Sequence, residues 1–271
     1  MDTQAEGRPM ESFAERYEAV LVPVIFRPWA AELVGRTVPR DGEQVLDLAC
    51  GTGVLTREIA RSSATLGGLT GVDLSADMLG VARDRAAKSG LVAEWIEASA
   101  GELPFPDDRF DLAFCQQALQ FFPDRPGALQ ELRRVVRAGG RVAFCVQREL
   151  ASNPLLRSQA AALDKHVGPE AGDAVRAICS LSDADEIHGL FHDAGFTGID
   201  IESVTLSLHH PDGKAFAAGA MGGMHTGDKL SRMREVQRQH CIDDFLTELG
   251  DCFDGTAIRF PHVSHVITAR A

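Results

Sequence analysis

The feature that most constrains the fold is a short apolar run that leads into a glycine-rich turn. Residues 45–53 read Val-Leu-Asp-Leu-Ala-Cys-Gly-Thr-Gly. In a doubly wound α/β sheet, the first strand-to-helix turn of this kind lies where nucleotide-like ligands bind, because glycines let a ligand approach the backbone closely. The sequence therefore predicts a parallel sheet with a ligand site at the end of its first strand.

An acidic residue follows at the spacing of a ribose-binding carboxylate. Asp73 ends the next apolar run, 20 residues after Gly53, and a carboxylate can accept hydrogen bonds from both ribose hydroxyls. A glycine pair alone is weak evidence, with a plain turn as the alternative. A nicotinamide-dependent oxidoreductase is disfavoured, because Thr56 replaces the third glycine of the dinucleotide motif and Asp47 would face a pyrophosphate. Asp47 instead suits a ligand with a positive group.

Apolar periodicity predicts the order of strands and helices. Strand-like runs alternate with amphipathic segments through the first half, which is typical of a parallel sheet covered by helices. We expect strands at 43–48, 67–73, 91–97, 110–115, 140–147, 198–206 and 260–269. We expect helices near 53–62, 75–89 and 125–137, the last ended by a glycine in the left-handed region, and a helical stretch over 154–194.

Composition excludes several classes of protein. The chain has 27 Lys and Arg against 39 Asp and Glu, a net charge of -12, so its average surface repels a nucleic-acid backbone. No signal peptide and no apolar window near the roughly 20 residues of a membrane span is visible. Six scattered cysteines without a CxxC pair indicate reduced thiols and no structural zinc. We expect a cytoplasmic protein with a small-molecule substrate, no metal, and no nucleic-acid or membrane partner. Its oligomeric state is open.

Several ordered motifs together resemble the class I S-adenosylmethionine-dependent methyltransferases, in particular the group related to ubiquinone and menaquinone biosynthesis. The resemblance spans about residues 13–147. It rests on five motifs, at 45–53, 71–75 with Met78-Leu79, 102–107 (Glu-Leu-Pro-Phe-Pro-Asp), 110–111 and 132–140. It implies a Rossmann-like seven-stranded sheet of order 3-2-1-4-5-7-6 with an antiparallel last strand and helices on both faces. An N-terminal helical cover and a helical insert before the last strand complete the expected α/β fold.

The resemblance assigns cofactor-binding roles to particular residues. Asp47 and the backbone around the glycine turn would hold the methionine moiety, and Asp73 would hold the ribose. Ser99 stands where the family usually has an acidic residue that accepts from the adenine amine. The full set of implied contacts is Asp47, Ala49, Gly51, Thr52, Gly53, Asp73, Leu74, Met78, Ser99, Ala100 and Gln116.

The same resemblance divides the chain, which we expect to form a single domain over 1–271. Residues 11–36 read as two helices broken near Pro23 and form the cover. Residues 210–255 are too long for a hairpin loop and predict a lid or substrate pocket. The cofactor-binding core is expected at 37–150 and the C-terminal half at 151–271.

Two residues are candidates for catalysis. Tyr17 is the only tyrosine and lies in the cover, and His225 follows a Met-Gly-Gly-Met segment of the insert, where an imidazole could serve as a general base. Other histidines, including His262 and His265 on a strand, are expected to pack or to face solvent. We also expect Phe121 and Phe122 to pack under the substrate pocket.

These observations predict transfer of the S-adenosyl-L-methionine methyl group to an oxygen, nitrogen or carbon of a small acceptor, with S-adenosyl-L-homocysteine as the product. In-line displacement needs mainly alignment and exclusion of water, so an obvious catalytic dyad is not required. The alternative is a regulatory or interaction module that binds S-adenosylmethionine without transferring its methyl group.

Overall fold

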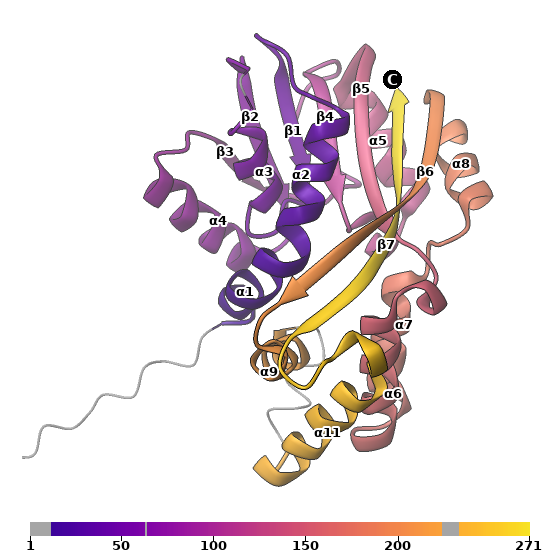
Figure 1. The fold of residues 1–271 in the computed structure, drawn as a ribbon. Helices are drawn as coiled ribbons and strands as arrows, with labels where there is room; N and C mark the ends of the chain where they lie inside the picture. Colours follow the sequence, from indigo (N-terminus) through magenta and orange to yellow (C-terminus); the bar gives the residue numbers. More distant parts are fainter. Residues whose placement is uncertain (1–11, 63, 224–232) are drawn as a thin grey trace, which may run out of the picture.

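A computed structural model of the chain describes residues 12–62, 64–223 and 233–271. Its centre is one seven-stranded sheet of order β3-β2-β1-β4-β5-β7-β6. The strands are β1 (Gln44–Leu48), β2 (Gly68–Asp73), β3 (Glu94–Glu97), β4 (Phe110–Gln116), β5 (Val136–Gln147), β6 (Thr197–His210) and β7 (Ile258–Arg270). β1 to β5 are parallel, and β7 is antiparallel to both neighbours (Figure 1). The predicted fold class and strand order are confirmed.

Helices cover both faces of the sheet. Alternate side chains of β4 divide between two cores: Leu112 and Phe114 pack with α2 and α3, while Ala113 and Cys115 pack with α5 and α8. The helices are α1 (Phe13–Arg16), η1 (Tyr17–Phe26), α2 (Arg27–Arg36), α3 (Val54–Ile59), α4 (Ala76–Ser89), α5 (Arg125–Val135), α6 (Pro154–His166), α7 (Pro169–Arg176), α8 (Ala184–Asp193), α9 (Gly213–Gly223) and α11 (Glu235–Glu248). Short 3-10 turns are η2 (Leu119–Phe121), η3 (Leu150–Ser152), η4 (Ala177–Cys179) and η5 (Gly250–Cys252).

The N-terminal cover differs from its prediction. Pro23 does not break the helix but lies inside η1, a π-helix of 10 residues that continues directly into α2. At its end the Arg27 N–H donates to the Val22 carbonyl, five residues back. A proline in an α-helix clashes with the carbonyl four residues earlier, and the wider π-helical turn accommodates this ring. The predicted break at Pro23 was therefore wrong.

Two other helix predictions need correction. α5 ends at Val135, and β5 begins at the next residue, so Gly139 with φ +74° lies inside the strand and not at a helix end. A register shift in the β4–β5 pairing explains the positive φ there. The stretch 154–194 is three helices and a 3-10 turn, interrupted at Gly168, which has φ +128°.

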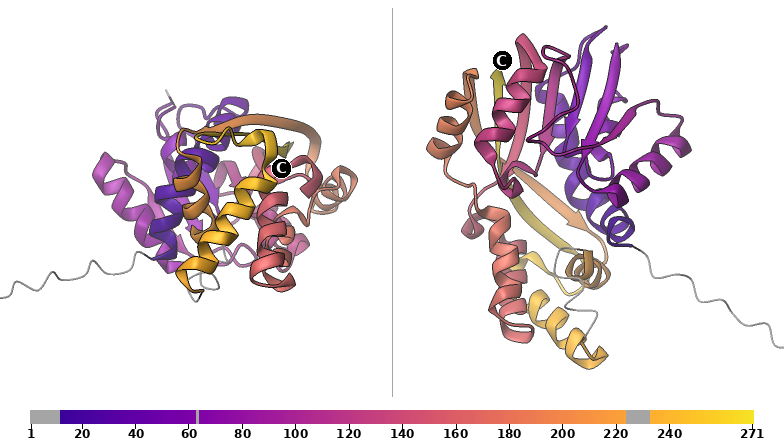
Figure 2. Two further views of the ribbon diagram at one scale, coloured as in Figure 1. Left: turned by 60° about the horizontal axis from the view of Figure 1, so that its bottom comes forward. Right: turned by 180° about the vertical axis from the view of Figure 1, so that it is seen from behind.

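β6 and β7 continue past the end of β5 and carry a helical layer. The last β5–β7 pair is Gln147 with Ser264, whereas β6–β7 pairing extends to His210 and Ile258. Figures 1 and 2 show this extension reaching α9, with α6, α7 and α11 gathered beside it beyond the carboxyl ends of the parallel strands. α9 and α11 lie in the segment predicted as an insert.

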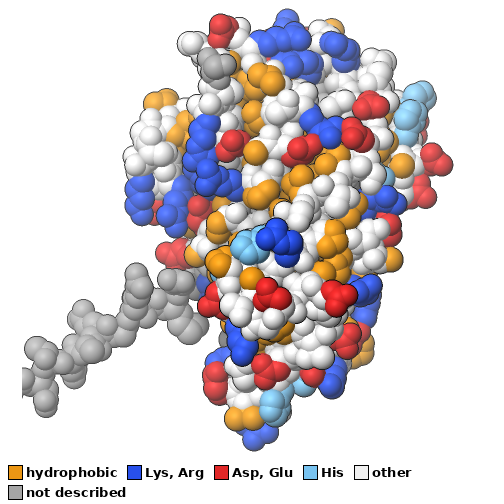
Figure 3. Space-filling model, viewed as in Figure 1, with side chains coloured by type: hydrophobic (Ala, Val, Ile, Leu, Met, Phe, Trp, Pro, Cys, Tyr) orange, Lys and Arg blue, Asp and Glu red, His pale blue; other side chains and the backbone are white. Residues whose placement is uncertain are grey.

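Charged side chains are mixed over the face seen in Figure 3, where Lys and Arg lie among Asp and Glu. Among the residues that the structure describes, no helix has the length and apolar character needed to cross a membrane.

Candidate functional site

Polar residues lie at or near the carboxyl ends of four adjacent strands, along one edge of the sheet. Asp47 is near the end of β1, and Asp73, Gln116 and Gln147 are the last residues of β2, β4 and β5. The carboxyl ends of parallel strands meet at the same edge, which is where ligands of doubly wound sheets bind. The candidate site is built from this edge.

The turn after β1 adopts the left-handed backbone that its sequence indicates. Ala49, Gly51 and Gly53 have φ values of 56°, 55° and 76°. A Cβ atom at Gly51 would meet nothing within 4 Å, so the turn opens onto free space at this residue. A Cβ atom at Gly53 would lie 2.7 Å from Trp95 Cη2, so this glycine is needed for packing as well as for φ.

Asp73 is anchored by the backbone and keeps acceptor capacity. Its Oδ2 accepts the Gly51 N–H at 2.8 Å, and its Oδ1 accepts the Ser75 N–H at 2.9 Å. Each carboxylate oxygen has two lone pairs, so each retains one for a ligand hydroxyl. Burial raises the pKa of Asp73 above its ordinary value, although these backbone hydrogen bonds oppose the shift.

Asp47 is the most buried of the acidic side chains at this edge, with 1% of its surface exposed. Thr56 Oγ1 donates to its Oδ2 at 2.5 Å. Burial raises the Asp47 pKa to about 7, against the lowering effect of Thr56. Thr56, which stands in place of the third glycine of the dinucleotide motif, therefore holds the carboxyl group that the methionine moiety is expected to meet.

A cavity of about 210 Å³ lies over the ends of β1 and β2, and we call it the Asp73 cavity. It brings together five of the predicted cofactor residues: Ala49, Asp73, Leu74, Ser99 and Ala100. The remaining lining residues are Leu48, Val72, Ala98, Gly101, Phe121, Phe122, Pro123, Asp124 and Ala128. Its walls are mainly apolar, with the carboxylates of Asp73 and Asp124 among the lining residues, and this combination suits a nucleoside.

The other predicted cofactor residues do not line this cavity. They are Asp47, Gly51, Thr52, Gly53, Met78 and Gln116. Thr52 Oγ1 is buried without a hydrogen-bond partner, and so is Gln116 Oε1, while Gln116 Nε2 donates to the Phe26 carbonyl at 2.7 Å. Met78 begins α4 beside Ser75, whose hydroxyl accepts the Met78 N–H at 3.3 Å. Ser99 Oγ accepts the Gly101 N–H at 3.2 Å, so the hydroxyl is held inside its own loop.

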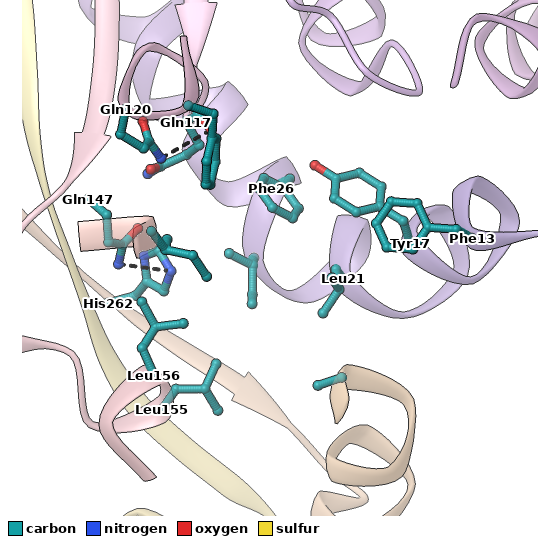
Figure 4. Close-up of a pocket in the computed structure, with 14 residues that line it drawn as sticks. Phe13, Tyr17, Leu21, Phe26, Gln117, Gln120, Gln147, Leu155, Leu156 and His262 are labelled. Carbon is teal, nitrogen blue, oxygen red and sulfur yellow. Dashed lines mark hydrogen bonds between the residues drawn. The ribbon is translucent and has the colours of Figure 1, made fainter. Parts of the chain in front are cut away.

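A second cavity, of about 130 Å³, lies between the cover, the sheet edge and the helical layer (Figure 4). We call it the apolar cavity. Its lining is Phe13, Tyr17, Leu21, Ile25, Phe26, Gln117, Gln120, Phe121, Gln147, Leu155, Leu156, Ile178, Ala220 and His262. Phe121 lines both cavities, so the two adjoin at this ring. The expectation that Phe121 packs underneath a pocket was wrong, because it lies on the wall and is 45% exposed.

Tyr17 lies between the two cavities. Its ring packs 4.7 Å from the Phe26 ring, centroid to centroid, and lines the apolar cavity. Burial raises its pKa well above 10, and the negative charges of Asp73, Glu18 and Asp47 raise it further. The phenol therefore keeps its proton and faces the acidic side chains of the cofactor edge.

An ion pair connects the cover to the helix that follows the glycine turn. Arg57 of α3 contacts Glu18 of η1 at 2.8 Å, and both side chains are largely buried. The same guanidinium donates to the Thr52 carbonyl at 2.6 Å. Tyr17 precedes Glu18, so this pair also fixes the position of the tyrosine. The other catalytic candidate, His225, lies outside the described residues.

Sequence reasoning missed the polar residues of the apolar cavity. Gln117, Gln120, Gln147 and His262 line it, and His262 was expected to pack or to face solvent. Only the position of the glutamines directly after β4 and at the end of β5 could have indicated them. No group of three or more His, Cys, Asp and Glu side chains within the described residues could hold a metal ion.

Comparison with known proteins agrees with this arrangement. The sequence profile of the ubiE/COQ5 methyltransferase family matches residues 10–210. The chain belongs to this family. The family resemblance inferred from the motifs is confirmed.

Named relatives have sequences similar to this chain, and a solved structure has a similar fold. The chain is 39% identical over 150 residues to a 2-phytyl-1,4-naphtoquinone methyltransferase of Synechococcus elongatus, covering 54% of this chain and 64% of that protein. It is 30% identical over 201 residues to the ubiquinone/menaquinone biosynthesis C-methyltransferase UbiE of Vibrio vulnificus, covering 68% and 77%. The fold is similar to the YcgJ protein of Bacillus subtilis, with a TM-score of 0.60 and 18% identity over 90% of this chain and 98% of that one.

Proposed function

We propose that this protein transfers the methyl group of S-adenosylmethionine to a small, apolar acceptor. The observation that carries the proposal is the meeting of two different cavities at Phe121. One contains the Asp73 carboxylate and reaches the glycine turn at Ala49, and the other has a mainly apolar lining. This arrangement places a donor and an acceptor side by side.

The residues of the Asp73 cavity fit S-adenosylmethionine. Asp73 would accept from the ribose hydroxyls through its two remaining lone pairs, and the open space at Gly51 admits the ligand to the backbone. Asp47, Thr52 and Gln116 would surround the methionine moiety, since two of them hold buried oxygens without partners. Ser99 would face the adenine edge. The bound sulfonium supplies an electrophilic methyl group.

The apolar cavity would align the acceptor and exclude water. Methyl displacement requires the two reacting atoms about 3 to 3.5 Å apart and in line, and holding them so lowers the barrier without further chemistry. None of the residues that line this cavity carries a charge at neutral pH. Where the acceptor must lose a proton, we assign the general base to His225 of the insert.

The substrate class follows from the relatives and from the cavity together. The two named relatives are a 2-phytyl-1,4-naphtoquinone methyltransferase and a ubiquinone/menaquinone biosynthesis C-methyltransferase, and a mainly apolar cavity lining suits a ring system of the quinone kind. The family profile ends at residue 210, whereas Ala220 and His262 of the cavity lie beyond it. The acceptor therefore depends on residues of this chain that the family match does not include.

Calorimetry and a transfer assay test the proposal. S-adenosylhomocysteine should bind to the wild-type protein, and labelled methyl should pass from S-adenosylmethionine to members of a panel of apolar phenols and hydroquinones. Binding without transfer to any member would favour the non-catalytic module. Preferential binding of a nicotinamide dinucleotide would favour the oxidoreductase. The adjoining apolar cavity argues for transfer.

The remaining expectations belong to the same proposal. We infer one domain, with 11–36 as cover, 37–150 as cofactor-binding core and 210–255 as substrate insert. A cytoplasmic location is supported by six cysteines that all remain free in the structure. The net charge of -12 supports a small-molecule substrate and no nucleic-acid partner.

A further inference from the structure

A buried histidine in the apolar cavity has its proton position fixed by a neighbour. His262 is 4% exposed, and its Nδ1 lies 2.7 Å from Trp29 Nε1. An indole nitrogen is always a donor, so Nδ1 must be the acceptor in this hydrogen bond. A neutral imidazole carries one proton, which is therefore on Nε2.

The partner of Nε2 is also a donor. Gln147 Nε2 lies 3.3 Å from His262 Nε2 and 2.8 Å from Asn153 Oδ1. Asn153 Oδ1 accepts the backbone N–H of Val263 at 2.8 Å, so it is an oxygen, and the Gln147 atom that faces it must be the amide nitrogen. Two N–H groups thus face each other, and neither can accept from the other.

Both of these donors are at the wall of a cavity. Gln147 and His262 line the apolar cavity, and Figure 4 shows them on one side of it, with Tyr17 and Phe13 across the space. A buried donor without an acceptor is costly, and a ligand oxygen placed beside the two nitrogens would satisfy both. The cavity therefore has a pair of unsatisfied donors at Gln147 and His262, next to apolar side chains that suit a ring system.

We propose that His262 binds the acceptor molecule, donating its Nε2–H, together with Gln147, to a carbonyl or hydroxyl oxygen of an uncharged, ring-bearing compound. Trp29 is a positioning residue that sets the tautomer of His262. Only the identity of the bound compound as the methyl acceptor rests on the proposed function. The binding position at His262 and Gln147 does not depend on methyl transfer.

Burial supports a neutral, donating imidazole. The pKa of His262 is lowered to about 3, and burial is its only cause. The one other titratable group lining the cavity is Tyr17, which stays protonated. His262 therefore donates throughout the range from pH 5 to 8 and does not act as a base.

A matched pair of probes isolates the oxygen. 2-Acetylnaphthalene and 2-isopropenylnaphthalene have the same shape, and they differ in a carbonyl oxygen against a methylene group. We expect His262→Asn to lower the ketone-to-alkene affinity ratio about fivefold, the range of one hydrogen bond. The Asn oxygen can still accept from Trp29, but no N–H remains at the Nε2 position. His265→Asn is the control, because His265 is also buried on β7 but lines neither cavity.

Nitrogen-15 NMR of labelled histidine reads the tautomer directly. One imidazole, missing from the His262→Asn spectrum, should show the neutral Nε2–H form from pH 5 to 8, and Trp29→Phe should convert it to a mixture of tautomers. An unchanged affinity ratio in His262→Asn, no binding of either probe, or an Nδ1–H tautomer in the wild type would overturn the proposal. S-adenosylhomocysteine binding distinguishes failure of the proposed function from failure of the His262 proposal. If S-adenosylhomocysteine does not bind but His262→Asn still lowers the ketone-to-alkene affinity ratio, only the proposed function is rejected.

Discussion

Thr56 donates its hydroxyl to Asp47 Oδ2 at 2.5 Å and so joins the first helix after the glycine turn to the strand before it. The bond is the only side-chain hydrogen bond recorded for Asp47 among the described residues, and it lies in a nearly solvent-free site. Desolvation of this buried carboxylate outweighs its hydrogen bonds from Thr56 and the nearby charge of Arg57, which is why its pKa rises to about 7.

Asp47 should make the protein less stable as pH rises. Its pKa is about 7 in the folded state and close to 3.9 in an unfolded chain, so the folded state binds the proton more tightly. The free energy of unfolding should therefore fall between pH 4 and 7, by up to about 4 kcal/mol at about 1.4 kcal/mol per pKa unit. Asp47→Asn removes this component. Urea unfolding at pH 5 and 7.5 checks it, and parallel pH profiles for the two proteins would contradict it.

The glycine turn and the acidic end of β2 could be predicted from the sequence, because short-range residue patterns determine them. The order of apolar runs, the glycines after β1 and the acidic end of β2 each depend on a few consecutive residues. The sheet order came from the resemblance and was confirmed. Periodicity alone could not have supplied it.

The apolar cavity could not be predicted in the same way, because it is assembled from distant segments. Trp29 and His262 are 233 residues apart, and their hydrogen bond depends on the cover and β7 packing together. The prediction of a helix break at Pro23 was wrong for a related reason. A π-helix accommodates the proline, and no residue pattern indicated this π-helix. Periodicity identifies elements, whereas these contacts follow from how the elements pack.

Asp73→Ala should weaken S-adenosylmethionine and S-adenosylhomocysteine binding at least tenfold. Two charge-assisted hydrogen bonds of roughly 1.5 to 3 kcal/mol each would lose their acceptor. Calorimetry measures the loss. Asp77→Ala is the matched control, since Asp77 is exposed on α4, four residues along, and lines neither cavity. Equal affinities for the folded Asp73 variant and the wild type would remove the ribose assignment.

Gly53→Ala should destabilise the protein by about 2 to 5 kcal/mol. A left-handed backbone costs an alanine roughly 1 to 2 kcal/mol, and the added Cβ would press on Trp95 at a cost of about 1 to 3 kcal/mol. Gly80→Ala offers the opposite case, because this α4 glycine has no atom within 4 Å of its Cβ position. That variant should gain about 0.5 to 1 kcal/mol. Thermal unfolding of both variants tests this contrast. A loss of stability in Gly80→Ala as large as that in Gly53→Ala would contradict it.

His225→Ala should reduce turnover by about two orders of magnitude if the acceptor must lose a proton, within the usual range of about 10² to 10⁴ for general bases. The wild-type rate should then rise as pH passes the imidazole pKa of about 6.5. S-adenosylhomocysteine affinity should stay unchanged. Steady-state kinetics with an identified acceptor measure both effects. A variant with full turnover would leave alignment alone as the mechanism.

Tyr17→Phe should lower turnover about fivefold without changing the shape of the pH profile. The phenol pKa is raised well above 10 by burial and by nearby Asp73, so its hydroxyl keeps its proton and does not act as a base, and one hydrogen bond from it is worth about 1 kcal/mol. Packing against Phe13 and Phe26 needs only the ring, so the unfolding temperature should hold. Tyr17 is the single tyrosine, and an ultraviolet difference titration therefore reports this group alone. Ionisation below pH 10 would show that the hydroxyl is solvated and does not face the buried carboxylates, and the expected loss of turnover would then have no basis.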